Sequence, residues 1–155
     1  MDNIDVQLLE SRRHLTEKCA RWNHGEWGRS IGRSLADTVA GFQAILDSDR
    51  ETALVAFVNG TPAGMVLLID CDLESHAHLK PWLAGLFVHP DFRGKGAARA
   101  LVAAVELMVG QRGDPSLYLY TAIPDYYRSL GWSTHEVLAR ADMHFEVMAK
   151  ELDPQ

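Results

Sequence analysis

Hydrophobic and polar residues alternate at the start of the chain, where Ile4, Val6 and Leu8 are separated by single polar residues. A period of two places the apolar side chains on one face of an extended segment. The pattern therefore predicts that the chain opens with a half-buried strand.

Two stretches after this strand repeat their apolar residues every three or four positions, which is the spacing of one helix face. The first is marked by Cys19 and Trp22 and runs to Gly25, and the second spans residues 35–46 behind Ser34. A serine before a helix can accept a hydrogen bond from a free N–H of the first turn. The pattern predicts two helices, the second with Ser34 as its N-cap.

Two apolar runs then follow, Ala53–Val58 and Thr61–Ile69, joined by Asn59-Gly60. Asparagine and glycine both tolerate the positive φ angles of a tight turn between antiparallel strands. The segment therefore predicts a β-hairpin.

A polar loop is expected over residues 70–80, followed by a buried strand over Pro81–Val88. This strand should stop at His89-Pro90, because proline has no N–H to donate to a neighbouring strand. Apolar residues on one face predict a helix from residue 96 that closes at Gly110.

The last third of the chain predicts a strand over Leu117–Thr121 and a short helix over Asp125–Leu130 that is capped by Gly131. Trp132–Leu138 and Met143–Lys150 are expected to form an antiparallel pair. The whole order predicts an α/β fold with a mixed sheet and a central strand-loop-helix crossover.

The chain has 155 residues, of which 47% are hydrophobic and 23% are charged. A domain of this size buries roughly 70% of its unfolded surface, so one domain over residues 1–155 is expected. A membrane-spanning helix needs about 18 consecutive apolar residues, and no stretch of the sequence approaches that length. No secretion signal is evident either. We therefore expect a cytoplasmic protein without a membrane partner. Cys19 and Cys71 are expected as free thiols outside any metal-ligand spacing.

The net charge of −6 argues against a nucleic-acid partner, since counterion release requires clustered Lys and Arg side chains. A cationic partner fits this charge better.

The segment before the central helix has the composition of a phosphate site. Gly94 and Gly96 permit tight backbone turns, and a helix that begins there presents unpaired N–H groups and a positive dipole end. Arg93 and Lys95 add positive charge. A P-loop is excluded because Lys95 is not followed by serine or threonine, and a dinucleotide fingerprint is excluded because Arg99 stands where its third glycine should be.

Arg93, Gly96 and Ala98 match the pattern [RQ]-x-x-G-x-[GA], and Val88 and Pro90 before them match V-x-P. This segment resembles the acyl-CoA loop of the GNAT superfamily of N-acetyltransferases. Alanine in place of the more common last glycine is permitted by the pattern and slightly crowds the pyrophosphate.

A second motif follows in the family's order, because Tyr126-Tyr127-Arg128-Ser129-Leu130-Gly131-Trp132 resembles the element F-Y-x-x-L-G-F. Residues 81–84, 119–121 and 147–150 resemble a bacterial subgroup of small single-domain members. The resemblance is strong over residues 81–132 and faint before residue 50.

The resemblance implies the GNAT fold, a central mixed and mostly antiparallel sheet with splayed parallel central strands and flanking helices. Acetyl-CoA would lie between these strands, and a backbone N–H near Phe87 would polarise the thioester carbonyl. The implied cofactor-binding residues are Leu86, Phe87 and Val88 for the pantetheine arm, and Arg93, Gly94, Lys95, Gly96, Ala97 and Ala98 for the pyrophosphate.

The resemblance also implies that Tyr127 is the general acid that protonates the departing thiolate, the alternative being a tyrosine that only packs beneath the short helix. An amine of pKa about 10.4 must lose its proton before it attacks, so a general base is expected. Glu26 is the first candidate for this base, and Asp70, Asp72 and Glu74 are the others.

Two further groups of residues allow both a structural and a functional interpretation. His76 and His78 lack a third ligand at metal spacing, so a solvated loop and no metal are expected. Four aromatic residues are expected in the core rather than in a cation-binding pocket. These are Trp22, Trp27, Trp82 and Tyr120.

The predicted function is that of an acyltransferase that moves an acetyl group from acetyl-CoA to a primary amine of a small molecule or peptide by direct attack in a ternary complex. The alternative is a GNAT-fold domain that binds acyl-CoA without catalysis and serves as a regulatory or partner domain. The sequence does not determine the acceptor, the acyl length or the oligomeric state, so a homodimer remains open.

Overall fold

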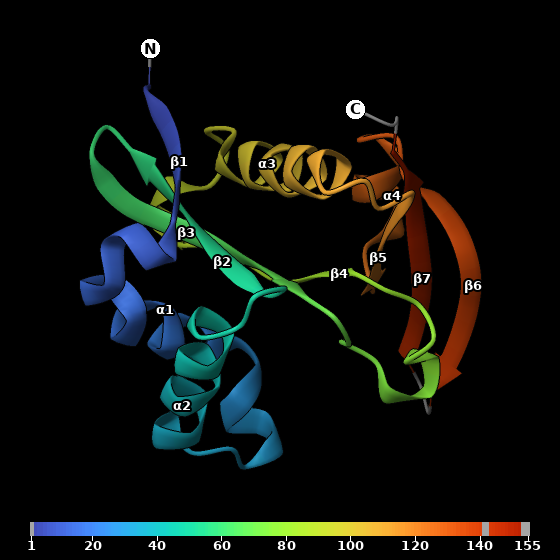
Figure 1. The fold of residues 1–155 in the computed structure, drawn as a ribbon, viewed down its shortest axis with the longest axis horizontal. Helices are drawn as coiled ribbons and strands as arrows, with labels where there is room; N and C mark the ends of the chain where they lie inside the picture. Colours follow the sequence, from blue (N-terminus) through green and yellow to red (C-terminus); the bar gives the residue numbers. More distant parts are fainter. Residues whose placement is uncertain (1, 141–142, 153–155) are drawn as a thin grey trace.

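The computed structural model describes residues 2–140 and 143–152, and these form a seven-stranded mixed sheet with helices on both faces (Figure 1). The strand order is β1-β2-β3-β4-β5-β7-β6. Neighbouring strands are antiparallel except β4 and β5, which are parallel. The predicted α/β fold class is confirmed.

The strands are β1 Ile4–Leu8, β2 Thr52–Val58, β3 Thr61–Ile69, β4 Trp82–Val88, β5 Ser116–Thr121, β6 Ser133–Arg140 and β7 Met143–Glu151. The helices are α1 Thr16–Asn23, α2 Leu35–Leu46, α3 Ala97–Gln111 and α4 Pro124–Arg128. The short helical turns are η1 Leu9–Leu15, η2 His24–Gly28, η3 Arg29–Ile31, η4 Glu74–His76 and η5 Pro90–Phe92.

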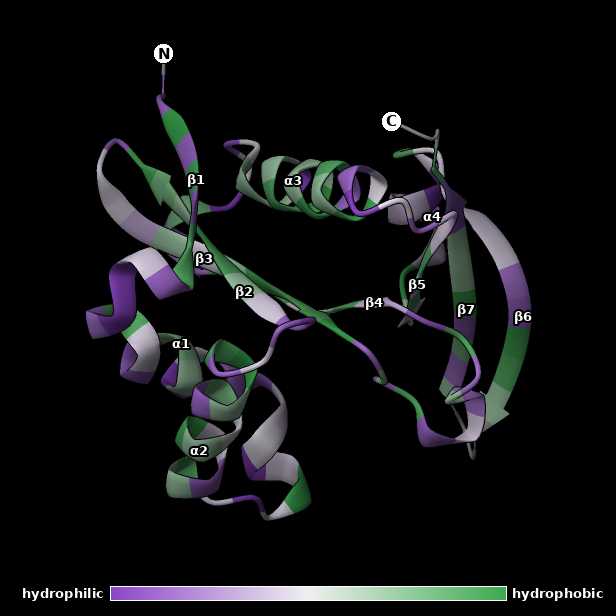
Figure 2. Ribbon diagram, viewed as in Figure 1, coloured by the Kyte–Doolittle hydropathy of each residue, from purple (hydrophilic) through white to green (hydrophobic). Residues whose placement is uncertain are grey.

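Side chains of β2 point alternately to the two faces of the sheet, as the pleat of a strand requires. Leu54 and Ala56 belong to the core that contains Leu101 of α3. Val55 belongs to the opposite core, which contains Phe42 of α2. In Figure 1, α3 lies on one side of the sheet, and α1 and α2 lie on the other. Strands β2 to β4, covered on both faces, are correspondingly hydrophobic (Figure 2).

The local signals of the first half of the chain are confirmed. Asn59 and Gly60 have φ angles of 50° and 85° and join β2 to β3. The Asp37 N–H donates to Ser34 Oγ at 3.0 Å at the start of α2. These contacts are between residues close in sequence, which is why the pattern alone was sufficient to predict them.

Several boundaries differ from the prediction by one or two residues, and the ends of two helices differ for a clear structural reason. The first helix does not stop at Gly25, because α1 is continued by the π-helical turn η2 over His24–Gly28. Helix α3 passes Gly110 and ends at Gln111, since Gly113, with a φ of 85°, is the left-handed residue that terminates it.

Strand β7 lies between β5 and β6, and its consecutive residues Glu146, Val147 and Met148 are all buried. Such a strand is covered on both faces, so burial does not alternate along it. Among the helices of the described residues, none is both long and apolar enough to cross a membrane.

Candidate functional site

The parallel strands β4 and β5 pair only near their starts, at the first residue of β4 and the third residue of β5. Trp82 is in register with Tyr118, whose N–H donates to the Pro81 carbonyl at 3.0 Å. No further register pair joins the two strands within the described residues, and Figure 1 shows them diverging. Beyond Trp82, the backbone N–H and C=O groups of β4 that face β5 are therefore not paired by that strand. Because such groups require a hydrogen-bond partner, a ligand could bond to them.

Strand β4 is also bent by a β-bulge opposite the segment between Met65 and Leu67 of β3, where the register shifts by one residue. Gly85, in the bulge, has a φ of 59°, and a Cβ at that position would lie 3.1 Å from Leu67 Cδ1. Only glycine satisfies both constraints without strain. Leu86, the next residue, lies beside the open gap.

The loop that follows β4 ends in two glycines of left-handed conformation, Gly94 with φ 79° and Gly96 with φ 96°. Gly96 is the N-cap of α3, and no side chain of the described residues caps this terminus. The N–H groups of Ala97, Ala98 and Arg99 are in the first turn, where a helix offers them no intrahelical partner. An uncapped helix start of this kind has the N–H groups and the dipole orientation that suit an anion.

A cavity of about 520 Å³ lies between β4, this loop and α4. All of the predicted cofactor-binding residues except Lys95 line this cofactor-side cavity. They are Leu86, Phe87, Val88, Arg93, Gly94, Gly96, Ala97 and Ala98.

The two basic residues of the loop are held by protein groups. Arg93 Nε donates to the Val88 carbonyl at 2.9 Å, which ties the loop to the end of β4. Lys95 Nζ lies 3.4 Å from Asp2 Oδ2. A hydrogen bond from Asn59 and, second, the charge of Lys95 lower the pKa of Asp2. Lys95 thus pairs with the segment that precedes β1, and it does not line the cavity.

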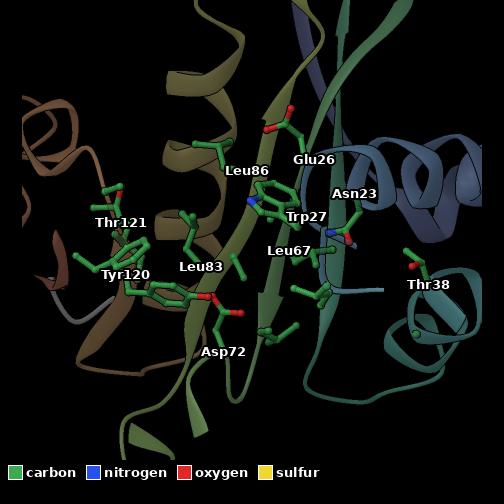
Figure 3. Close-up of a pocket in the computed structure, with 18 of the residues that line it drawn as sticks. Asn23, Glu26, Trp27, Thr38, Leu67, Asp72, Leu83, Leu86, Tyr120 and Thr121 are labelled. Carbon is green, nitrogen blue, oxygen red and sulfur yellow. The ribbon is translucent and has the colours of Figure 1, made fainter. Parts of the chain in front are cut away.

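A larger cavity of about 860 Å³ lies between the α1–α2 layer and the sheet. Its sheet wall is apolar and includes Leu67, Leu83 and Leu119. Two acids, Glu26 and Asp72, also line it, and Figure 3 shows them at opposite ends of the cavity.

The two cavities share part of their lining. Residues from η2, the β4 bulge and the segment that leads into α4 line both of them, namely Glu26, Leu86, Ile123 and Tyr127. Glu26 and Tyr127 are predicted as candidates from segments far apart in the sequence. In the structure both line the junction, the region where the two cavities meet. Ligands in the two cavities would therefore approach each other there.

Tyr127 is only 7% exposed and packs edge-on against two aromatic rings, Tyr126 at 5.2 Å and Trp132 at 6.1 Å between centroids. Burial, and second the neighbouring Tyr126, raises the pKa of Tyr127 to about 12. Within the described residues, no group accepts a hydrogen bond from its hydroxyl. The phenol is thus protonated at neutral pH and available to a ligand.

The four candidate acids are in different environments. Glu26 is an exposed residue of the π-helical turn η2, a kind of distortion that is frequent at functional sites. Asp72 is partly buried, and burial raises its pKa to about 7. Asp70 is 3.1 Å from Arg50 Nε, and Glu74 is exposed, and neither lines the larger cavity.

The four aromatic candidates divide evenly. Trp82 is fully buried, and Trp22 packs on Phe87 with 5.6 Å between ring centroids, so these two belong to the core as predicted. Trp27 and Tyr120 are 40% and 37% exposed and line the larger cavity, so the core prediction is wrong for them.

The prediction of a solvated loop is wrong for His76, which is 8% exposed. Its Nε2 lies 2.9 Å from Glu136 Oε1, and its Nδ1 lies 2.8 Å from Ser75 Oγ. His76 thereby fastens the loop after β3 to strand β6. Among the described residues, no group of His, Cys, Asp and Glu side chains could hold a metal ion, and both cysteines are free.

Several lining residues were not indicated by the sequence. Arg99 and Tyr126 line the cofactor-side cavity, Thr38 and Phe145 line the larger one, and Ile123 lines both. Tyr126 is the first residue of the second motif and Arg99 directly follows the first motif, so their positions in the sequence could have indicated them. The other three reach the site through long-range packing that no local pattern records.

Comparison with known proteins identifies a matching family and proteins of the same fold. The model of the acetyltransferase (GNAT) family matches residues 16–132. An acetyltransferase from Yersinia pestis (strain Pestoides F) is 34% identical over 98 residues, which are 60% of this chain and 65% of that protein. The chain thus matches less than two thirds of that relative's length.

Solved structures share the fold at low sequence identity. An aminoglycoside 6'-N-acetyltransferase complexed with coenzyme A superposes with a TM-score of 0.76 at 18% identity, over 97% of this chain and 98% of that one. A protein of Salmonella typhimurium, solved with its cofactor acetyl-CoA, gives 0.72 at 15% identity over 98% and 95% of the two chains.

Proposed function

The chain belongs to the acetyltransferase (GNAT) family, and on that premise we propose that it transfers an acetyl group from acetyl-CoA to a primary amine. The observation that carries the proposal is the junction of the two cavities at Glu26, Leu86, Ile123 and Tyr127. A cofactor in one cavity and an amine in the other would bring thioester and nucleophile together there. Such proximity is what direct attack in a ternary complex requires.

Acetyl-CoA would occupy the gap between β4 and β5. Relatives of the same fold have been solved with coenzyme A or acetyl-CoA bound. The pantetheine arm would bond to the free backbone groups of residues 86–88, which β5 does not pair. The pyrophosphate would lie on the N–H groups of residues 93–98, at the uncapped start of α3. In this arrangement backbone groups supply most of the binding.

In the proposed reaction the amine nitrogen attacks the thioester carbonyl carbon and forms the new C–N bond. A backbone N–H near Phe87, beside the bulge, would stabilise the negative charge on the carbonyl oxygen. The C–S bond then breaks, the sulfur takes a proton from Tyr127, and Glu26 takes the proton that the amine loses. The step leaves a Tyr127 phenolate and a protonated Glu26, and return of that proton from Glu26 to Tyr127 restores both groups. Where the acceptor arrives as an ammonium ion, its additional proton goes to the solvent, so no further reactant is needed.

Two features of Tyr127 suit it to the role of acid. Its pKa of about 12 keeps the phenol protonated until sulfur departs. Transfer from such a phenol to a free thiolate, whose acid has a pKa of about 8.5, is uphill by roughly 5 kcal/mol. The proton must therefore move as the C–S bond breaks, in a pocket that holds the two atoms together and limits water.

The proposed base must offset the cost of deprotonating the acceptor. For an amine of pKa about 10.4 this cost is about 4.6 kcal/mol at pH 7. The position of Glu26 supports its assignment as the general base. It is the acid that lines both cavities, whereas Asp72 lines only the larger one.

A screen of amines tests the proposal directly. Purified protein is incubated with acetyl-CoA and monoamines, diamines or peptides, thiol release is followed continuously, and the acetylated product is identified by mass spectrometry. We expect acetylation of at least one amine above the rate of thioester hydrolysis. Tight acetyl-CoA binding without transfer to any amine class would instead indicate an acyl-CoA-binding domain without catalysis.

A further inference from the structure

The larger cavity has one acid at each end, and the register of the sheet separates them. Glu26 lies at the junction beside Leu86, whereas Asp72 follows the end of β3, where Ile69 is in register with Trp82. The segment of β4 from Trp82 to Leu86 spans roughly 10–13 Å at the usual rise of a strand. Figure 3 likewise shows Asp72 at the end of the cavity away from Glu26 and Leu86.

Asp72 has an environment unlike that of its neighbours in the same loop. Asp70 is bonded to Arg50, and Glu74 is exposed to water. Asp72 is partly buried and lines the larger cavity, and in Figure 3 the Tyr120 side chain is directed toward it. The charged form of a partly buried carboxylate is favoured by an opposite charge nearby, and an incoming ammonium group would supply that charge.

The wall between the two acids is hydrocarbon on the sheet side. It is formed by Leu67, Leu83 and Leu119. Arg33 is the basic residue of this lining, and its Nη2 donates to the Asp37 carbonyl at 3.2 Å on α2. The cavity therefore offers a carboxylate, then an apolar surface, then a second carboxylate.

From this arrangement we propose that Asp72 binds a second, non-reacting ammonium group, so that the acceptor is a diamine whose two nitrogens are separated by an apolar chain. This inference rests on the proposed function, and it makes Asp72 a specificity residue. The reacting nitrogen would lie at the junction near Glu26, the methylenes along the sheet wall, and the far nitrogen at Asp72. Asp72 lines only the larger cavity and not the junction, so in this proposal Glu26 keeps the role of base.

The test compares putrescine, cadaverine and hexamethylenediamine, each against the monoamine of equal chain length. A hydrogen bond to a charged group is typically worth enough to change an equilibrium by about tenfold or more. We expect kcat/KM for the best diamine to exceed that of its monoamine by at least about tenfold, and Asp72→Asn to abolish this ratio. Glu74→Gln, which removes an acid of the same loop outside the cavity, should leave the ratio unchanged.

A binding measurement separates this inference from the proposed function. Calorimetric titration of hexamethylenediamine into the protein saturated with coenzyme A should show an affinity that Asp72→Asn weakens by about tenfold or more. Weaker binding in that variant supports the subsite even if no amine is acetylated. A diamine-to-monoamine ratio, or a diamine affinity, that persists in Asp72→Asn would overturn the subsite, while acetylation of monoamines would leave the proposed function standing.

Discussion

Arg128 Nη2 donates a hydrogen bond of 2.6 Å to Glu146 Oε1, and this contact joins α4 to β7. Arg128 directly follows Tyr127 in the chain. The Glu146 side chain is 8% exposed, and it also bonds to Thr134 of β6. The short helix that carries the proposed acid is therefore fastened to the sheet by a nearly buried carboxylate.

We expect Glu146→Gln to lower both the thermal stability and kcat, because α4 loses its charged anchor. The bond from Thr134, opposed by burial and reinforced by Arg128, lowers the pKa of Glu146. A lowered folded-state pKa contributes stability above the unfolded value of about 4.3, and that contribution is lost as pH falls through the lowered value. The Tm of the wild type should thus drop more steeply on acidification than that of the variant. Equal slopes would contradict this role.

Gly96→Val should abolish stabilisation by acetyl-CoA, because valine strains a backbone with a φ of 96° and distorts the anion site. A ligand at 100 times its Kd raises stability by about 2.7 kcal/mol. Gly113→Val is the matched control, since Gly113 has a φ of 85°, open surroundings and no part in the cavities. Both variants should be destabilised, and only Gly113→Val should retain the thermal shift.

Glu26→Gln should reduce kcat, or raise the KM of the acceptor, with little effect on the affinity for acetyl-CoA. The neutral amide cannot take the amine proton, and the backbone contacts of the cofactor are untouched. Glu17→Gln serves as the control, because Glu17 is 65% exposed and pairs with Arg21 on α1. A parallel loss of acetyl-CoA binding, measured by titration, would assign Glu26 to the cofactor instead.

The raised pKa of Asp72 predicts a stability difference that depends on pH. The folded protein holds this proton up to about pH 7, whereas an unfolded aspartate releases it near pH 3.9. The stability that this group contributes is therefore fully present below about pH 4 and is lost as pH rises through about 7. Asp72→Asn should gain Tm relative to the wild type at pH 8 but not at pH 4. An unchanged difference between the two pH values would place Asp72 in contact with water.

The sequence predicts the parts of the site that depend on neighbouring residues. The glycines at 94 and 96, the helix that begins after them and the hairpin at Asn59-Gly60 are short-range features, and each is present in the structure. Contacts between segments far apart in the sequence could not be predicted in this way. Lys95 looks like a phosphate ligand in its own loop, yet it pairs with Asp2, 93 residues away.

The same limit explains why the acids of the loop after β3 are indistinguishable in the sequence. Asp70 and Asp72 have similar neighbours, but Arg50 reaches only the first of them, and burial acts on the second. The bulge at Gly85 also depends on a partner strand, because the register shift is defined against β3. Long-range packing, rather than local propensity, decides which residues enter the cavities.

Tyr127→Phe tests the proposed acid with minimal change in shape. The phenylalanine ring keeps the contacts with Tyr126 and Trp132, and no protein hydrogen bond is lost among the described residues.

General acid catalysis typically contributes about 10²–10⁴-fold, so single-turnover rates should fall by that order while the affinity for acetyl-CoA stays near that of the wild type. Single-turnover measurement is needed because slow product release can hide the chemical step in kcat. Tyr118→Phe is the control, since Tyr118 lines neither cavity, and its rate should change little. A decrease below about threefold in Tyr127→Phe would mean that the phenol only packs beneath α4, because removal of a working acid raises the barrier by far more than that factor.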